Sequence, residues 1–219
     1  MKNDLTELVF ILDKSGSMSG LEEDTIGGFN AMLAKQQKQA GQAVVTTVLF
    51  DDKYEVLHDR ININGIKPIT DREYFVGGCT ALLDAVGKTI SKIGKVQKYT
   101  SDEERAAKVL FVITTDGMEN ASCEYSYDKI KSMIERQKEK YGWEFIFLGA
   151  NIDAVATAAK FGINEDRAAN YHADAQGTIQ NYESLSFAVS ELRTSKALDG
   201  SWKVKIDEDF KSRSQNRRK

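Results

Sequence analysis

Residues 8–20 read LVFILDKSGSMSG, and this stretch decides the fold. It opens with five consecutive apolar residues, which is typical of a strand buried on both faces of a sheet. The residues that follow are an acid, hydroxyl-bearing residues and glycines, which are not suited to a hydrophobic core. Asp13, Ser15 and Ser17 alternate there, so their oxygens can converge if the backbone stays extended. We therefore expect a central strand that supports a functional loop.

The side chains of this loop indicate that it binds a cation. All three alternating side chains offer oxygen, and only one of them is a carboxylate. Such donors suit a hard cation, Mg²⁺ or alternatively Mn²⁺ or Ca²⁺, whereas zinc prefers cysteine and histidine. Cys79 and Cys123 are not spaced as a metal clip, and they are too few for a disulfide framework.

The rest of the chain alternates apolar strand patterns with helical patterns. A second apolar run, VLFVITTDG at residues 109–117, again ends in an acid and a glycine. The other predicted strands are 42–50, 54–63, 144–148 and 168–172. The predicted helices run from a capping box at Ser19 and Glu22 to about residue 39, and over 81–93, 127–141, 152–161 and 178–194.

This alternation predicts an α/β fold. We expect a Rossmann-like, doubly wound, mostly parallel central sheet with helices on both faces and one antiparallel edge strand. Residues 54–63 are the expected edge strand, because their apolar and polar side chains alternate. Ligands of such sheets bind at the carboxyl ends of the strands. The loop after Asp13, the glycine-rich loop at 77–80 and the loop at Asp116 should therefore form one site.

Composition and charge limit the classes of function. The chain has 219 residues, of which 41% are hydrophobic and 29% charged, enough to bury one substantial core. Its net charge of −3 argues against binding nucleic acid through a broad basic surface. No apolar signal region precedes the first strand, and no run approaches the roughly 20 apolar residues of a membrane helix. We expect a soluble, cytoplasmic protein without membrane contact.

Two polar segments stand outside this pattern. Residues 95–108 are polar and charged and predict a surface excursion. The last ten residues, 210–219, carry five basic groups and no acid. We expect a solvated tail there, with a basic arm for nucleic acid or an acidic partner as the alternative.

Three motifs together resemble a known metal site. They are DKSGS at 13–17, Thr80 within GGCTALLDA at 77–85, and TTDG at 114–117. In order and spacing they look like the metal-ion-dependent adhesion site, or MIDAS, of von Willebrand factor A domains. D-x-S-x-S alone would be weak evidence. A strand before it, a glycine-preceded threonine and a strand-terminal Asp-Gly make the resemblance specific.

The resemblance implies a role for each residue. Ser15, Ser17 and Thr80 would bind the cation through hydroxyl oxygens, while Asp13 and Asp116 would act through water or hydrogen bonds. Neutral ligands leave the cation much of its charge, so an open coordination position attracts a carboxylate from outside. Taken singly, each residue also has a structural explanation, Thr80 as a helix cap and the two acids as loop caps.

The implied function is a metal-dependent protein–protein interaction module without enzymatic activity. Its partner would be a protein that supplies an Asp or Glu to the metal. The resemblance is to the stand-alone prokaryotic or phage type, which works beside ATPases or in stress-response or phage-linked assemblies. It implies a von Willebrand factor A domain at residues 1–195 and a C-terminal extension at 196–219 that ends in the basic tail.

Two other functions remain open at this point. The first is a metal-dependent phosphohydrolase with Asp13 as the nucleophile, since an acid at a strand end beside Mg²⁺ can take up a phosphoryl group. Against it, such enzymes carry a second acid two residues further on, where this chain has Ser15. The second is a nucleic-acid-associated subunit that uses the basic tail.

Overall fold

The computed structural model describes residues 4–194 and 198–216. Within these residues, six strands form one sheet in the order β3-β2-β1-β4-β5-β6, and only β3 runs antiparallel to its neighbour. The strands are β1 (Thr6–Asp13), β2 (Ala43–Phe50), β3 (Tyr54–Asn62), β4 (Lys108–Thr115), β5 (Glu144–Ala150) and β6 (Ala168–Tyr171). The predicted fold class is confirmed, including the antiparallel edge strand.

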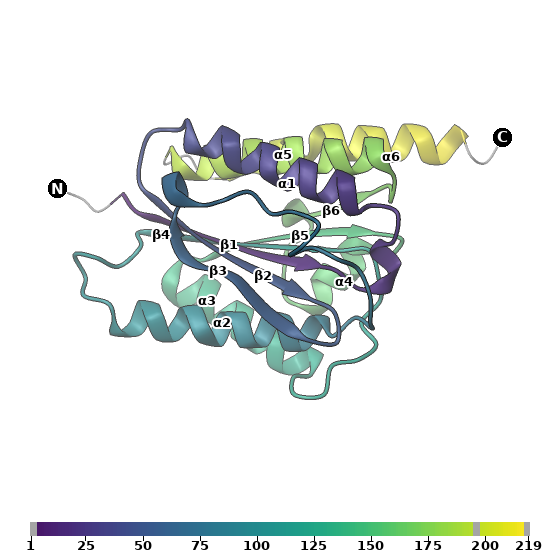
Figure 1. Ribbon diagram of the computed structural model, residues 1–219. Helices are drawn as coiled ribbons and strands as arrows, with labels where there is room; N and C mark the ends of the chain where they lie inside the picture. Colours follow the sequence, from purple (N-terminus) through teal and green to yellow (C-terminus); the bar gives the residue numbers. More distant parts are fainter. Residues whose placement is uncertain (1–3, 195–197, 217–219) are drawn as a thin grey trace.

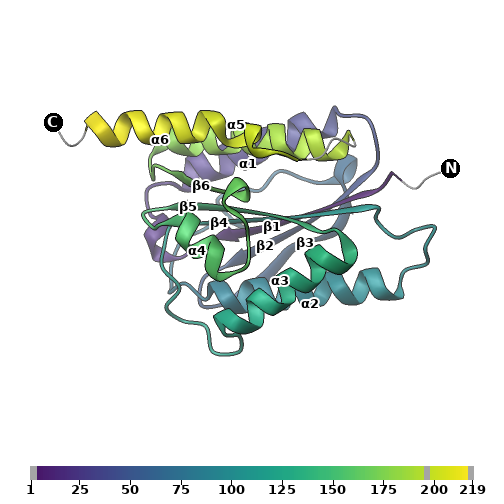
Figure 2. The same cartoon turned by 180° about the vertical axis from the view of Figure 1, so that it is seen from behind.

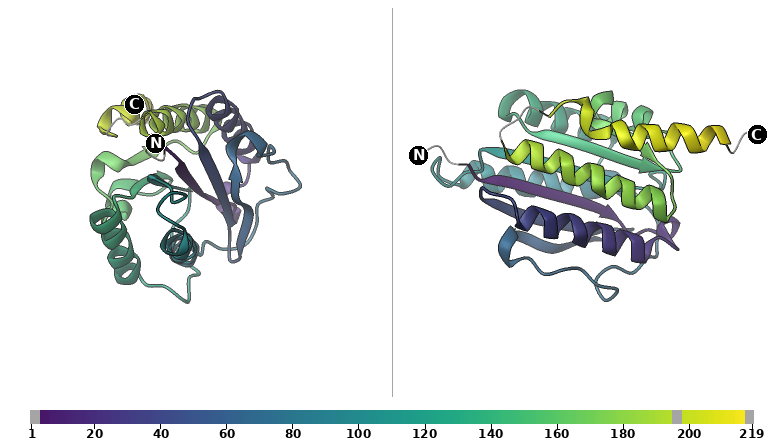
Figure 3. Two further views of the ribbon diagram at one scale, coloured as in Figure 1. Left: turned by 90° about the vertical axis from the view of Figure 1, so that its left-hand side faces the viewer. Right: turned by 90° about the horizontal axis from the view of Figure 1, so that it is seen from above.

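Helices cover both faces of the sheet. In Figures 1 and 3, α1, α5 and α6 lie on one face, and Figure 2 shows α2, α3 and α4 on the other. The helices are α1 (Glu22–Gln37), α2 (Leu82–Tyr99), α3 (Tyr127–Tyr141), α4 (Ala154–Lys160), α5 (Ala175–Arg193) and α6 (Val204–Asn216). None of the helices within 4–194 and 198–216 is long and apolar enough to span a membrane.

Strand β1 sits between two hydrophobic cores. Leu8, Phe10 and Leu12 face α1 and α5, whereas Val9 and Ile11 face α2 and α3. Each of these side chains is buried, because side chains of a strand alternate between the two faces and both faces are covered. The five apolar residues that open the first motif are therefore the centre of the fold.

The order of the strands places a switch point beside β1. The chain builds outward from β1 to β2 and β3 and then returns to add β4, β5 and β6 on the other side. Asp13 at the end of β1 pairs with Phe50 of β2, and Leu12 pairs with Thr114 of β4. The carboxyl ends of the three central strands thus meet at one edge, where sheets of this type bind ligands.

Several helix boundaries differ from the sequence prediction; α5, for example, begins at Ala175, three residues before its predicted start. The capping box at Ser19 does not form: α1 begins at Glu22 without a side-chain cap, and the Glu22 carboxylate accepts a hydrogen bond from Gly20 N at 2.6 Å. Helix α2 continues to Tyr99, six residues beyond the prediction, and the Gln97 amide in this added part donates a hydrogen bond to the buried carboxylate of Glu7. The expected excursion at 95–108 is therefore reduced to residues 100–107.

The C-terminal extension contains a helix that the sequence pattern did not predict. Helix α6 packs on β6 and α5, and the ring of Phe210 stacks on His172 at 4.7 Å. Arg213 forms an ion pair with Asp209 at 3.0 Å and another with Asp174. Residues 210–216 of the expected solvated tail are helical, although none of residues 210–215 is buried, and the basic residues at 217–219 lie outside the described residues.

The extension contributes to the core through Trp202, which is fully buried with Leu198 and Ile206. We expect Trp202→Ala to lower the free energy of unfolding by about 3–5 kcal/mol, because it removes a large buried side chain and leaves a cavity. Urea denaturation measures this loss. Val204→Ala, at a half-exposed position of the same segment, should stay within about 0.5 kcal/mol of the wild type. Equal stability of both variants would contradict the packing described.

Candidate metal centre

The three predicted motifs lie together at the carboxyl edge of the sheet, toward which the arrowhead of β1 points in Figure 1. Backbone hydrogen bonds join the first two of them. Lys14 N donates to Phe50 O at 2.7 Å, Gly16 N donates to Gly78 O at 3.1 Å, and Gly77 N donates to Lys14 O at 2.9 Å. The loop after β1 therefore lies between the end of β2 and the glycine-rich loop before α2.

Two glycines allow the loops to approach this closely. Gly78 has a φ of +72°, and a Cβ there would lie 2.4 Å from Asp52 Oδ1. A Cβ on Gly117 would lie 2.9 Å from Ser17 Oγ and 3.1 Å from Thr80 Oγ1. The first position needs glycine for its backbone conformation, and the second needs it because the hydroxyls of the other two motifs press against the chain after β4.

The hydroxyl groups of the motifs converge. Ser15 Oγ lies 3.0 Å from Ser17 Oγ, and Thr80 Oγ1 donates to Ser15 Oγ at 3.0 Å. Asp13 lies behind them and is buried. Its Oδ1 accepts a hydrogen bond from Ser15 N at 2.7 Å, and its Oδ2 accepts one from Thr115 Oγ1 at 2.6 Å. Asp13 thereby holds the loop that carries Ser15 against the end of β4.

Asp116 differs from Asp13 in its hydrogen bonding. It is only 2% exposed, and neither of its carboxylate oxygens has a hydrogen-bond partner among the described residues. Burial raises its pKa. Contacts with the Ser17 hydroxyl and with its own backbone N–H oppose the rise, although neither meets the geometry of a hydrogen bond. Burial also raises the pKa of Asp13, the hydrogen bonds from Ser15 and Thr115 oppose it, and the nearby Asp116 adds to the rise.

These features fit a cation. A buried carboxylate without a partner is costly, and a cation beside it offsets that cost. Within 4–194 and 198–216 no three His, Cys, Asp or Glu side chains gather as a metal site, so the donors here are mainly hydroxyls. Oxygen donors of this kind suit Mg²⁺, Mn²⁺ or Ca²⁺. His58 and His172 lie elsewhere, on β3 and after β6.

Several supporting residues lie outside the five predicted metal residues. Tyr74 Oη donates to Asp13 O at 2.5 Å, and no sequence pattern pointed to it. Asn120 binds Thr80 twice, since its Oδ1 accepts from Thr80 N at 2.9 Å and its own N donates to Thr80 O at 3.0 Å. Thr115 adjoins Asp116 in the TTDG motif, and that adjacency was the available signal.

Two further carboxylates hold the loop after β4 against α2. Asp84 accepts hydrogen bonds from the backbone N of Cys123, Glu124 and Tyr125 at 2.9–3.0 Å. Glu119 accepts from Leu83 N at 2.9 Å and from the backbone N of its own loop. Both acids are therefore engaged in positioning the backbone and are not directed at the converging hydroxyls.

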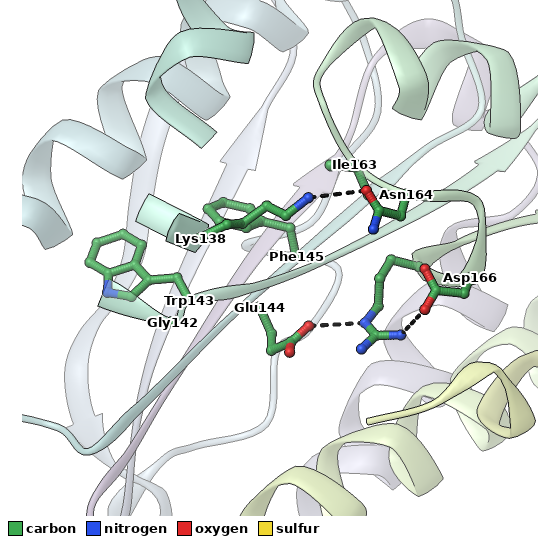
Figure 4. Close-up of a pocket in the computed structure, with 9 residues that line it drawn as sticks. Lys138, Gly142, Trp143, Glu144, Phe145, Ile163, Asn164 and Asp166 are labelled. Atoms are coloured by element: carbon green, nitrogen blue, oxygen red, sulfur yellow. Dashed lines mark hydrogen bonds and ion pairs between the residues drawn. The ribbon is translucent and has the colours of Figure 1, made fainter. Parts of the chain in front are cut away.

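The cavity shown in Figure 4 is not part of this centre. It has a volume of about 230 Å³ and lies where β5 begins, at the opposite edge of the sheet. Arg167 in its wall pairs with Glu144 at 2.9 Å and with Asp166 at 2.6 Å, and Lys138 Nζ lies 3.3 Å from Asn164 Oδ1. The polar groups that line it are thus largely paired with one another.

Comparison with known proteins places the fold. No family model and no curated protein matches the chain. Among solved structures, proximal thread matrix protein 1 of the mussel byssus has a TM-score of 0.57 at 12% identity, covering 87% of this chain and 47% of that one. The von Willebrand factor type A protein of Catenulispora acidiphila has a TM-score of 0.57 at 13% identity, covering 84% and 42%. The chain has a von Willebrand factor A-like fold.

Two further details of the similar solved structures concern the site and the length. In another structure of the mussel protein, zinc occupies the MIDAS motif. The minor pilin PilB of Streptococcus sanguinis has a TM-score of 0.58 at 13% identity. The match covers 88% of this chain and 63% of the pilin. This chain therefore spans less than two thirds of each of these structures, and about half of the mussel protein.

The unpaired charge of Asp116 gives a testable expectation for the metal-free protein. Asp116→Asn keeps the shape of the side chain and removes the buried charge, so in chelator it should raise the melting temperature by roughly 2–4 °C. Added Mg²⁺ should then have little further effect. The exposed Asp71 provides the control, because Asp71→Asn should leave both melting curves unchanged. A fall in stability of metal-free Asp116→Asn would show that the carboxylate is satisfied without a cation.

Proposed function

We propose that this chain is a metal-dependent protein-interaction module that binds a divalent cation at the carboxyl edge of its sheet. The unpartnered, buried carboxylate of Asp116 beside three converging hydroxyls is the observation that carries the proposal. Ser15, Ser17 and Thr80 would hold the cation through their hydroxyls, and Asp13 and Asp116 would hold it through water or hydrogen bonds. When bound, the cation supplies a positive charge that a carboxylate can bind.

The donor chemistry selects the cation. Hydroxyl and carboxylate oxygens favour a hard ion, and we propose Mg²⁺, with Mn²⁺ or Ca²⁺ as alternatives. The zinc found in the MIDAS of the mussel protein makes zinc a useful member of any metal series. Soft ligands that would favour zinc over magnesium are absent from the five proposed metal residues.

A protein is the proposed partner, and its Asp or Glu would bind the metal. Two large apolar side chains stand exposed on the loops that carry the site, Phe75 with 59% and Met118 with 76% of its surface accessible. Phe75 lies under the ammonium of Lys14, whose Nζ is 4.4 Å from the centre of the ring. Exposed apolar groups around a charged centre are typical of protein-binding surfaces.

Catalysis by Asp13 is disfavoured by its contacts. A nucleophilic carboxylate must reach its substrate, but Asp13 is buried and both of its oxygens accept hydrogen bonds. The nucleic-acid alternative is weakened because Arg213 of α6 is paired with Asp174 and Asp209. A cytoplasmic setting, in an ATPase-linked, stress-response or phage-linked assembly, is proposed on the sequence resemblance.

Thermal melting after chelation tests the metal site. A ligand that binds only the native state at a hundredfold excess over Kd adds about 2.7 kcal/mol, which should raise the melting temperature by roughly 5–10 °C. The double variant Ser15→Ala with Ser17→Ala should lose this shift for Mg²⁺ and Mn²⁺. Ser19→Ala, exposed in the same loop, should keep it. An equal shift in the double variant would remove these serines from the site.

Water-proton relaxation of bound Mn²⁺ tests the carboxylate partner. A short blocked peptide containing one Glu should displace metal-bound water and lower the relaxation enhancement at millimolar concentration. The same peptide with Gln in place of Glu serves as the matched control and should have no effect. If both peptides act alike, or neither acts, the metal has no open position that selects a carboxylate.

A further inference from the structure

Helix α1 carries a row of four exposed residues on the side that faces away from the sheet. In the right-hand view of Figure 3, α1 and α5 lie side by side over the sheet. Successive members of the row are four residues apart, so they follow one line along the helix. This α1 ridge consists of Glu23, Gly27, Ala31 and Lys35, all of which are exposed. The proposed function uses none of these residues.

Gly27 lies in the interior of α1, and packing within the chain does not explain it. Glycine at such a position destabilises a helix relative to alanine. The neighbouring Gly28 is explained by packing, because a Cβ there would lie 2.3 Å from the ring of Tyr182. A Cβ at Gly27 would meet nothing within 4 Å. The described residues therefore gain nothing from a glycine at position 27, which indicates a close neighbour from outside the chain.

A groove runs beside the ridge, between α1 and α5. Its volume is about 300 Å³, and its lining includes Gly27, Ala31 and Ile179. Ile179 is 52% exposed, and Phe187, further along the same helix, is 50% exposed. Small residues allow another helix to approach closely, and the exposed apolar side chains beside them give that helix a surface to cover.

The charges of the ridge identify the partner. Glu23 lies at one end and Lys35 at the other, and neither forms an ion pair with any of the described residues. A two-fold axis that passes between Gly27 and Ala31 reverses the ridge. It would set Glu23 against Lys35 of a second copy, and Lys35 against Glu23 of that copy. The ridge is therefore complementary to itself, as the interface of a symmetric dimer must be.

The geometry of helix packing permits this arrangement. Helices that contact each other along ridges of residues four apart cross at about 50°. At that angle the two ridges lie antiparallel and in line, with Gly27 and Ala31 at the crossing. Small residues there let the helix axes approach to about 8 Å. We propose that this chain forms a symmetric dimer in which the α1 ridge of each copy packs against that of the other.

The dimer has a consequence for the candidate metal centre. Helix α1 begins directly after the loop that carries Ser15 and Ser17 and runs away from the carboxyl edge of the sheet. An antiparallel pair of α1 helices therefore places the two carboxyl edges at opposite ends of the dimer. Each edge stays open, so one dimer could bind two partner molecules. The dimer follows from the ridge alone, whereas this bivalency rests on the proposed function.

Sedimentation equilibrium in chelator and low salt tests the dimer. One pair of crossing helices buries a small area, so we expect a dissociation constant on the order of 100 µM. Wild-type protein that stays monomeric up to about 1 mM overturns the proposal and leaves the ridge to a different protein. Because the buffer contains no free divalent metal, the result is independent of the metal centre.

Charge reversal tests the two-fold pairing. Glu23→Lys alone and Lys35→Glu alone each set like charges together at both ends of the ridge, so each should weaken dimerisation at least about 10-fold. An equimolar mixture of the two variants should restore the wild-type dissociation constant, because in the mixed dimer each lysine faces a glutamate. Lys129→Glu, at an exposed position of α3, should have no effect. Single variants that dimerise like the wild type, or a mixture that stays monomeric, overturn the pairing.

Gly27→Gln tests the close approach of the helices. In the monomer the new side chain has room, and loss of the glycine should raise the melting temperature by roughly 2–4 °C. In the dimer it would hold the two ridges apart, so dimerisation should weaken at least about 10-fold. Ser132→Gln, exposed on α3, is the matched control and should dimerise like the wild type. Undiminished dimerisation of Gly27→Gln overturns the assigned interface.

Discussion

The arrangement of the loops at the carboxyl edge of the sheet depends on the hydrogen bonds of the Asp13 carboxylate. One oxygen accepts from Ser15 N in its own loop, and the other accepts from Thr115 Oγ1 at the end of β4. A single buried carboxylate thereby joins the two strands on either side of the switch point. Asp13 is the last residue of the central strand, so the core on both faces of β1 fixes its position. The loop that follows, which carries the hydroxyls, is positioned in turn by its bond to Asp13.

Asp13 and Asp116 show how two carboxylates at one edge can differ in role. Asp13 is satisfied by the protein alone, so it can hold the loops before any ligand binds. Asp116 has no such partner among the described residues, and its burial carries a cost that the fold does not offset. A folded protein retains such a cost when the group serves a function, and this asymmetry supports a ligand at the site more strongly than the convergence of hydroxyls does.

The sequence was sufficient for the architecture because the signals were local. Five apolar residues in β1 and the similar run in β4 predict strands buried on both faces, and the strand-end rule then brings Asp13 and Asp116 together. That rule does not place Thr80, because the strand before its loop, β3, is antiparallel and ends at the opposite edge of the sheet; Thr80 was assigned to the site by the family resemblance. Contacts between distant segments were not accessible in the same way. Tyr74 reaches Asp13 O from 61 residues away, and no periodicity indicates this. Helix α6 was not predicted because its sequence is strongly charged and the large apolar residue of this segment, Trp202, lies before the helix begins.

The direction of β1 determines how the molecule can be presented to another surface. The chain enters β1 at Thr6, at the edge far from the candidate site, whereas α6 runs toward the side on which that site lies (Figure 1). A tether attached ahead of Thr6 would leave the carboxyl edge of the sheet pointing away from the support and open to large molecules. A tether attached beyond Asn216 would emerge on the same side as that edge, where it would leave less space for large molecules to approach. The orientation of an immobilised or fused form is therefore set by which end carries the attachment.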